Sequence, residues 1–271
     1  MNNFEIDITY RCNLACKWCD RLCGTEFRRP IDMTATQLER YVSIIAPHIN
    51  RRSSIRILGG EPMLHPQIFK MLDILIQAIR PLIEFPITIV TNGYGEKVNN
   101  VLTQIRECYD TCDNSHLSTN TTLRPSSSKQ FCIVASKTLR PEAYVEQYHT
   151  SVTRAAIDFM SRSEITKYAE TCWVRRTCGY GITAHGIFIC AGAAPSICGL
   201  FKLNPGLDHF PTTKEEDEQA ERICEYCRIP CDPNQDLSGP PKIRPAILLS
   251  KSYENAIREW RRESYHLPVV L

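Results

Sequence analysis

Three cysteines near the start of the chain constrain its fold more than any other feature. Cys12, Cys16 and Cys19 follow one another at the spacing C-x3-C-x2-C. They come directly after segment 4–9, in which every second residue is apolar, so a short β-strand is predicted there. A loop that leaves a strand can wrap three thiolates around one small object, and soft thiolate ligands favour zinc or an iron–sulfur cluster. Because a structural zinc site is closed by four ligands, three thiolates leave one metal position open.

Predicted strands and helices alternate along the first part of the chain. Short strands are predicted at 55–58, 87–91, 115–119 and 131–135, and helices at 38–49, 68–79, 98–105 and 142–160. This alternation predicts a parallel sheet with crossover helices. Roughly five or six such units are counted by residue 160, whereas a closed eight-unit barrel needs about 250 residues. The predicted fold class is therefore α/β, with a partial, open TIM-like (β/α)6 barrel.

Polar and glycine-containing motifs follow several of the predicted strands. The cysteine triad, segment 59–62 (Gly-Gly-Glu-Pro) and segment 91–93 (Thr-Asn-Gly) each come where a strand ends. In parallel barrels the reactive groups gather at the carboxyl ends of the strands, so these motifs are expected on one rim. Adjacent glycines permit close approach of a ligand to the backbone, although two glycines or an Asn-Gly pair after a strand are also typical of an ordinary turn.

The triad segment resembles the cluster-binding loop of the radical S-adenosylmethionine (SAM) superfamily. The resemblance implies a 4Fe–4S cluster held by Cys12, Cys16 and Cys19, with its open iron chelated by the amino and carboxylate groups of SAM. Trp18 stands where the superfamily places an aromatic residue against the adenine. The glycine-rich segment resembles the motif that meets the ammonium group of SAM. The SAM contacts implied at the strand ends are Gly59, Gly60, Glu61, Pro62, Thr91, Asn92 and Ser118.

A second group of cysteines begins after residue 165, where the composition changes. Its members are Cys172, Cys178, Cys190, Cys198, Cys224, Cys227 and Cys231. Segment 181–190 is punctuated by glycine and predicts a β-hairpin that turns at 184–186. We therefore divide the chain into a partial barrel at 1–165 and a second, cysteine-rich domain at 166–271.

The cysteine-rich domain is similar to the SPASM/twitch extension of radical SAM enzymes, a hairpin and helix that hold one auxiliary 4Fe–4S cluster (twitch) or two (SPASM). Cys190, Cys224 and Cys227, with either Cys172 or Cys178, fit the one-cluster form. The longer form needs further cysteines that this sequence lacks. The alternative is a zinc ribbon made by the same residues and retained for stability.

Net charge, apolar runs and the number of cysteines exclude several classes of function. A net charge of +2 gives no electrostatic footprint for nucleic acid, and no apolar run approaches the ~20 residues of a membrane span. The start lacks a signal-peptide pattern. Fourteen cysteines without a secretory signal argue for thiols that serve metal in a reducing compartment, so we expect a cytoplasmic protein.

The resemblance implies an enzyme that reductively cleaves SAM to a 5′-deoxyadenosyl radical and abstracts a hydrogen atom from its substrate. We expect a radical SAM oxidoreductase that dehydrogenates or epimerises a carbinol carbon of a sugar-like or aminocyclitol-like metabolite. A flavodoxin or ferredoxin is the expected reducing partner. A peptide maturase and a zinc-stabilised, non-catalytic binding protein are the alternatives, and no spacing identifies a catalytic base.

The last 26 residues contain a predicted amphipathic helix. Tyr253, Ile257 and Trp260 share one face of it. We expect this face to pack on the outside of the barrel.

Overall fold

The computed structural model describes residues 2–14, 16, 19, 21–23, 31–113, 128–135, 155–203, 206–227 and 250–264. Its centre is one seven-stranded sheet in the order β4-β5-β3-β2-β1-β6-β7. Its strands are β1 (Phe4–Thr9), β2 (Ile55–Gly59), β3 (Ile87–Thr91), β4 (Thr111–Asp113), β5 (Phe131–Ala135), β6 (Tyr180–Thr183) and β7 (Gly186–Phe188). All neighbours are parallel except the β6–β7 hairpin. The sheet is open, as the sequence predicted.

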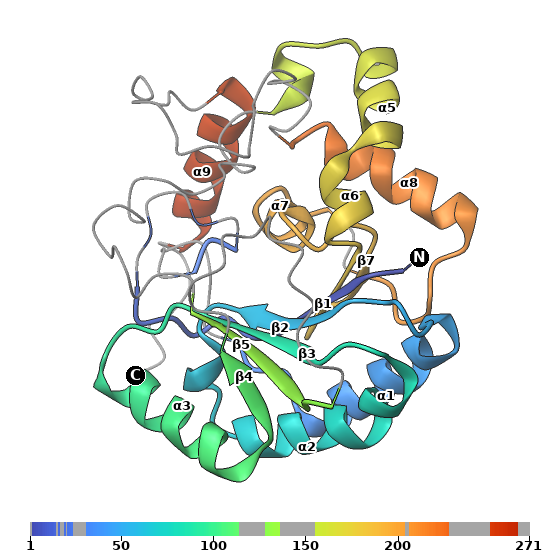
Figure 1. The fold of residues 1–271 in the computed structure, drawn as a ribbon. Helices are drawn as coiled ribbons and strands as arrows, with labels where there is room; N and C mark the ends of the chain where they lie inside the picture. The colour runs from blue at the N-terminus through green and yellow to red at the C-terminus, as the bar shows by residue number, and fades with distance from the viewer. Residues whose placement is uncertain are drawn as a thin grey trace.

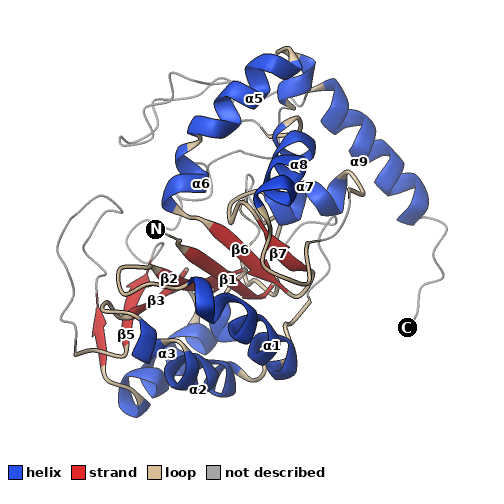
Figure 2. Ribbon diagram, turned by 90° about the vertical axis from the view of Figure 1, so that its right-hand side faces the viewer, coloured by secondary structure: helices blue, strands red, loops and turns tan. Residues whose placement is uncertain are grey.

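Helices lie on both sides of the sheet. One face is covered by α1 (Ala35–Ile45), α2 (Ile68–Ala78) and α3 (Glu96–Cys108) (Figure 1). The other side carries α5 (Arg162–Thr171), α6 (Trp173–Thr177), α7 (Ala194–Leu200), α8 (Thr213–Cys224) and α9 (Lys251–Ser264) (Figure 2). No helix in the described ranges is long and apolar enough to cross a membrane.

The first helix shows why the local sequence gives these elements. Thr34 begins α1 with a capping box, because its side chain accepts a hydrogen bond from the Gln37 N–H while the Gln37 side chain accepts one from the Thr34 N–H. Leu38, Val42 and Ile45 recur at helical spacing and are buried. These three side chains join the core between the sheet and α1–α3.

Strand β1 is buried on both faces. Phe4, Ile6 and Ile8 have no exposed surface and belong to the core under α1–α3. Because side chains alternate along a strand, Glu5 and Asp7 point to the opposite face, where they are also buried at 5% and 3% exposure. That face is covered by the second half of the chain.

The predicted hairpin forms, and it joins the barrel sheet. Strand β6 pairs parallel with β1, with Phe4 opposite Tyr180 and Ile6 opposite Ile182. The sixth parallel strand therefore comes from the segment that the sequence assigned to the cysteine-rich domain, and the two parts share one sheet.

The last helix packs differently from the expectation. Tyr253 of α9 has no exposed surface and lies in a second core with Phe188, Ile197 and Ile223, away from the helices outside the barrel. Its hydroxyl donates to the Tyr226 carbonyl at 2.8 Å. Tyr253 and Ile257 of the predicted apolar face both pack in this core, so the helix covers the cysteine-rich part of the chain.

Some predictions concern residues outside the described ranges. These are the strand at 115–119, most of the helix at 142–160, and the residues Trp18, Ser118 and Cys231. The short strand β4, immediately before the predicted strand at 115–119, was not predicted.

Candidate active site

The triad lies on the loop that leaves β1. Two backbone hydrogen bonds shape its end: the Cys19 N–H donates to the Cys16 carbonyl at 3.2 Å, and the Leu22 N–H to the Cys19 carbonyl at 2.9 Å. Cys16 is buried, and Cys12 and Cys19 are half-buried. The loop thus gathers its thiols in a sheltered position.

The three thiols are close enough to interact electrostatically. Burial, with a smaller effect of negative charge on Cys19, Glu61 and Cys16, raises the pKa of Cys12 to about 11, although a backbone hydrogen bond from Leu14 acts in the opposite direction. Thiols in such a place bind metal with release of protons, because the positive charge of iron stabilises their thiolate forms. The donor set therefore fits a thiolate-ligated cluster.

The two glycines at the end of β2 allow the chain to approach itself. A Cβ on Gly59 would lie 2.3 Å from the Thr9 carbonyl oxygen, and one on Gly60 would lie 2.2 Å from that of Arg11. The Gly60 N–H donates to Thr9 at 2.8 Å, and the Glu61 N–H donates to Arg11 at 2.7 Å. This approach fixes the start of the triad loop.

Glu61 joins the ends of β2 and β3. It has no exposed surface. Its carboxylate accepts hydrogen bonds from the Thr91 hydroxyl at 2.7 Å, the Asn92 N–H at 2.6 Å and the Met63 N–H at 3.1 Å. Pro62 follows it in the buried 3-10 turn Pro62–Leu64. The glycine-rich segment and the Thr-Asn-Gly segment thus form one hydrogen-bonded unit.

Asn92 connects this unit to the triad loop. Its amide nitrogen donates to the Asn13 side-chain oxygen at 2.8 Å and lies 3.9 Å from the Cys12 sulfur. Asn13 in turn donates to the Tyr94 carbonyl at 2.5 Å. The sequence analysis missed Asn13, although its place between the first two triad cysteines was visible.

A second set of thiols gathers behind the sheet. Burial, with a smaller effect of negative charge on Cys172, raises the pKa values of Cys190 and Cys224 to about 12. Cys227 lies in the same turn as Cys224, since its N–H donates to the Cys224 carbonyl at 3.2 Å. We call Cys172, Cys190, Cys224 and Cys227 the second cysteine group.

Cys178 has different neighbours. Its sulfur lies 3.9 Å from Nη1 of Arg56, and Arg56 also pairs with Glu5 at 3.1 Å. Burial, together with the negative charge of Glu5, raises the pKa of Cys178 to about 12, although the positive charge of Arg56 acts in the opposite direction. Of the two cysteines before the hairpin, Cys172 interacts with both Cys190 and Cys224. Cys178 interacts with Cys190 and lies on the Glu5–Arg56 side of this group.

The described cysteines differ from both a disulfide framework and a preformed site for a single metal ion. The described cysteines are not joined to one another by disulfides. In the ranges that the structure describes, no three His, Cys, Asp or Glu side chains lie close enough to share one metal ion.

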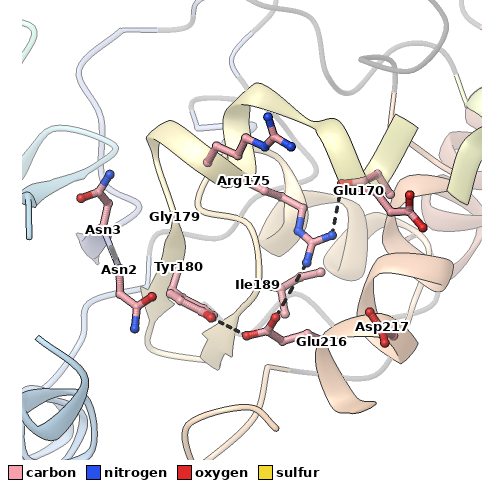
Figure 3. A pocket seen from close by; sticks show the side chains of 11 residues that line it. Asn2, Asn3, Glu170, Arg175, Gly179, Tyr180, Ile189, Glu216 and Asp217 are labelled. Atoms are coloured by element: carbon pink, nitrogen blue, oxygen red, sulfur yellow. Dashed lines mark hydrogen bonds and ion pairs between the residues drawn. The ribbon is translucent and has the colours of Figure 1, made fainter. Parts of the chain in front are cut away.

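A surface pocket of about 360 Å³ opens beside the second cysteine group (Figure 3). On its wall the Tyr180 hydroxyl contacts Glu216, and Arg175 lies 4.0 Å from the same carboxylate. Two other lining residues, Ala169 and Ile189, pack against thiols of the group. None of the residues predicted to bind metal or SAM lines this pocket, so it is separate from the rim.

The family model of the Radical SAM superfamily matches residues 6–118, which include β1 to β3 and the triad. This part of the chain is therefore similar to the radical SAM domain. No curated protein sequence matches the chain.

Two solved structures are distantly similar to the chain. The crystal structure of BtrN in complex with AdoMet and 2-DOIA is 12% identical, with a TM-score of 0.40, over 90% of this chain and 97% of that one. Native anSMEcpe with bound AdoMet is 13% identical, with a TM-score of 0.40, over 97% of this chain and 97% of that one. Similarities this low do not assign a function.

Proposed function

We propose that the chain is a radical SAM oxidoreductase that dehydrogenates or epimerises a carbinol carbon of a sugar-like or aminocyclitol-like metabolite, with the help of an auxiliary 4Fe–4S cluster. One observation carries the proposal: the chain builds two separate sets of interacting thiols, one on the rim of a radical SAM domain and one behind the same sheet. A single structural metal would need only one set.

Different residues of the rim would bind the cluster and position the loop that carries it. Cys12, Cys16 and Cys19 would hold the first cluster, which together with SAM supplies a 5′-deoxyadenosyl radical. Glu61 fixes the backbone where the ends of β2 and β3 meet. Asn92 donates a hydrogen bond to the side-chain amide of Asn13 in the triad loop. These buried contacts keep the loop in one geometry and limit the entry of water.

The second cysteine group, or the same group with Cys178 in place of Cys172, would hold the auxiliary cluster, which would supply an acceptor for the second electron of an oxidation. The burial of these cysteines supports this role, because a low-dielectric site excludes competing electron donors. A flavodoxin or ferredoxin in the cytoplasm would deliver the first electron.

Metal content tests the cofactor part of the proposal. Anaerobically purified protein should contain about eight irons with matching sulfide, falling to about four in the Cys12→Ala/Cys16→Ala/Cys19→Ala variant. A Cys190→Ala/Cys224→Ala variant should also retain about four, and these should be the SAM-cleaving ones. Zinc with little iron, and no 5′-deoxyadenosine formed from SAM under reduction, would refute the proposal.

Isotope transfer tests the substrate class. Sugars and aminocyclitols deuterated at single carbinol carbons should pass deuterium into 5′-deoxyadenosine, with one ketone or inverted carbinol formed per SAM cleaved. Cys108→Ala, a change at an exposed cysteine outside both thiol sets, is the matched control and should leave turnover unchanged. If only peptides become modified, the small-molecule assignment is wrong.

A further inference from the structure

Four charged side chains form a connected cluster on the sheet face opposite α1–α3. Glu5 and Asp7 project from β1, Arg56 from β2, and Arg21 from the triad loop. Arg21 donates to Glu5 at 2.8 Å and lies 3.5 Å from Asp7, while Arg56 pairs with the second oxygen of Glu5 at 3.1 Å. We call these four residues the charge bridge.

Arg21 also reaches the second half of the chain. Its Nη2 donates to the carbonyl of Ala191 at 3.1 Å, immediately after Cys190 of the second cysteine group. In the opposite direction, Arg21 follows Cys19 of the triad by two residues. The neighbouring residue Leu22 packs into the core formed by α7, α8 and α9. One short segment therefore joins the triad loop to the backbone beside Cys190.

The charge bridge is sheltered from solvent where it meets Arg21. The side chains of Arg21, Glu5 and Asp7 are 14%, 6% and 3% exposed, and that of Arg56 is 33% exposed. Charges in such a setting are screened weakly by water and salt, so each one acts strongly on its neighbours. The bridge holds two positive and two negative groups, so removal of any one leaves an uncompensated buried charge.

We propose that Arg21 is a positioning residue that couples the two cysteine centres: it anchors the segment after Cys190 to the triad loop, and its charge sets the reduction potential of the second centre. This inference rests on the proposed function, because it requires a cluster on the second cysteine group. Reduction adds negative charge to a cluster. A nearby positive charge therefore favours reduction, and a nearby negative charge opposes it.

The sign of the effect separates charge from mere packing. Arg21→Gln leaves Glu5 and Asp7 in excess and should shift the midpoint potential of the second centre to more negative values. Glu5→Gln leaves the guanidinium groups in excess and should shift it to more positive values. The double variant restores the charge balance, so its potential should return toward that of the unchanged protein. Arg21→Lys keeps the positive charge, so the midpoint potential of the second centre should stay close to that of the unchanged protein.

The test is a potentiometric titration of the full, anaerobically loaded protein, followed by electron paramagnetic resonance. Arg106→Gln is the matched control, because Arg106 of α3 forms an exposed pair with Asp113. It should leave both potentials unchanged. Thermal unfolding of each variant identifies any that fails to fold, and Glu5→Gln together with Arg21→Lys then still tests the direction of the shift.

The outcomes distinguish the two proposals. Shifts of opposite sign for Arg21→Gln and Glu5→Gln, with cancellation in the double variant, support the coupling. Two loaded centres whose potentials do not respond, or respond with the same sign, overturn the coupling and leave the proposed function intact. A protein that never holds a second set of irons refutes the proposed function and the coupling with it.

Discussion

Gly60→Ala tests the close approach that holds the triad loop in place. A methyl group at this position would lie 2.2 Å from the Arg11 carbonyl oxygen, so the two backbone segments must separate by about 1 Å to reach an ordinary contact. The Glu61 N–H to Arg11 hydrogen bond of 2.7 Å and the Gly60 N–H to Thr9 bond of 2.8 Å would then be stretched beyond useful length.

The cost follows from these contacts. A buried hydrogen-bonding group left unsatisfied costs about 1–3 kcal/mol, and forcing an extra methyl group into a packed site costs about 1–3 kcal/mol. We expect a loss of roughly 2–5 kcal/mol, which lowers the melting temperature by roughly 5–15 °C for a chain of this size. Because the disturbed segment leads into Cys12, iron bound at the triad should fall more than iron bound at the second cysteine group.

Calorimetry of the metal-free protein and iron analysis of the loaded protein measure the two effects. Gly199→Ala is the matched control, because Gly199 is an exposed residue of α7, where alanine favours the helix. It should be neutral or slightly stabilising. A Gly60→Ala protein with unchanged unfolding and full iron at the triad would show that the strand ends do not approach as described.

Three further changes have defined outcomes. Tyr253→Ala should cost about 3–5 kcal/mol in thermal unfolding, because the side chain is fully buried and donates to Tyr226, whereas Tyr253→Phe should cost only about 1 kcal/mol. Thr91→Val removes the 2.7 Å hydrogen bond to buried Glu61 and should cost about 1–3 kcal/mol, while Thr91→Ser should restore most of it; equal stability of the two would argue against the bond. Burial lowers the pKa of His65 below its ordinary 6.5, so the folded state binds the proton more weakly than the unfolded state. The stability that the neutral side chain gives above pH 6.5 should therefore be lost as the pH falls from 6.5 through the lower pKa of the folded state. His65→Gln should weaken this pH dependence in unfolding titrations, and an unaltered profile would contradict the assignment.

Much of the barrel half could be predicted because its signals are local. Alternation in segment 4–9 and helical spacing of Leu38, Val42 and Ile45 report which face of each element is apolar, and the structure buries those faces. The strand ends were also predictable, because turn residues and glycines stand where the apolar runs stop. The family match over residues 6–118 agrees with the resemblance seen in the triad.

Local patterns failed where packing between distant segments decides the outcome. The amphipathic face of α9 was visible, but its partner was not, because several apolar surfaces could have received it. The sequence also left Cys172 and Cys178 equivalent, since both precede the hairpin. They differ in the structure because Cys178 meets Arg56 from β2, a residue 122 positions away.

The sequence by itself determined the alternation of strands and helices from β1 to α3 and the strand ends at which the motifs stand, and it predicts soft-ligand chemistry for the cysteines. Only the tertiary structure decided that the hairpin extends the barrel sheet beside β1, and that Glu5 and Asp7 are buried against Arg21. The physical reason is that side-chain periodicity reports the orientation of a residue within its own element, whereas its neighbours depend on long-range pairing. The contact between Arg21 and Ala191 spans 170 positions, and no local pattern of residues specifies it.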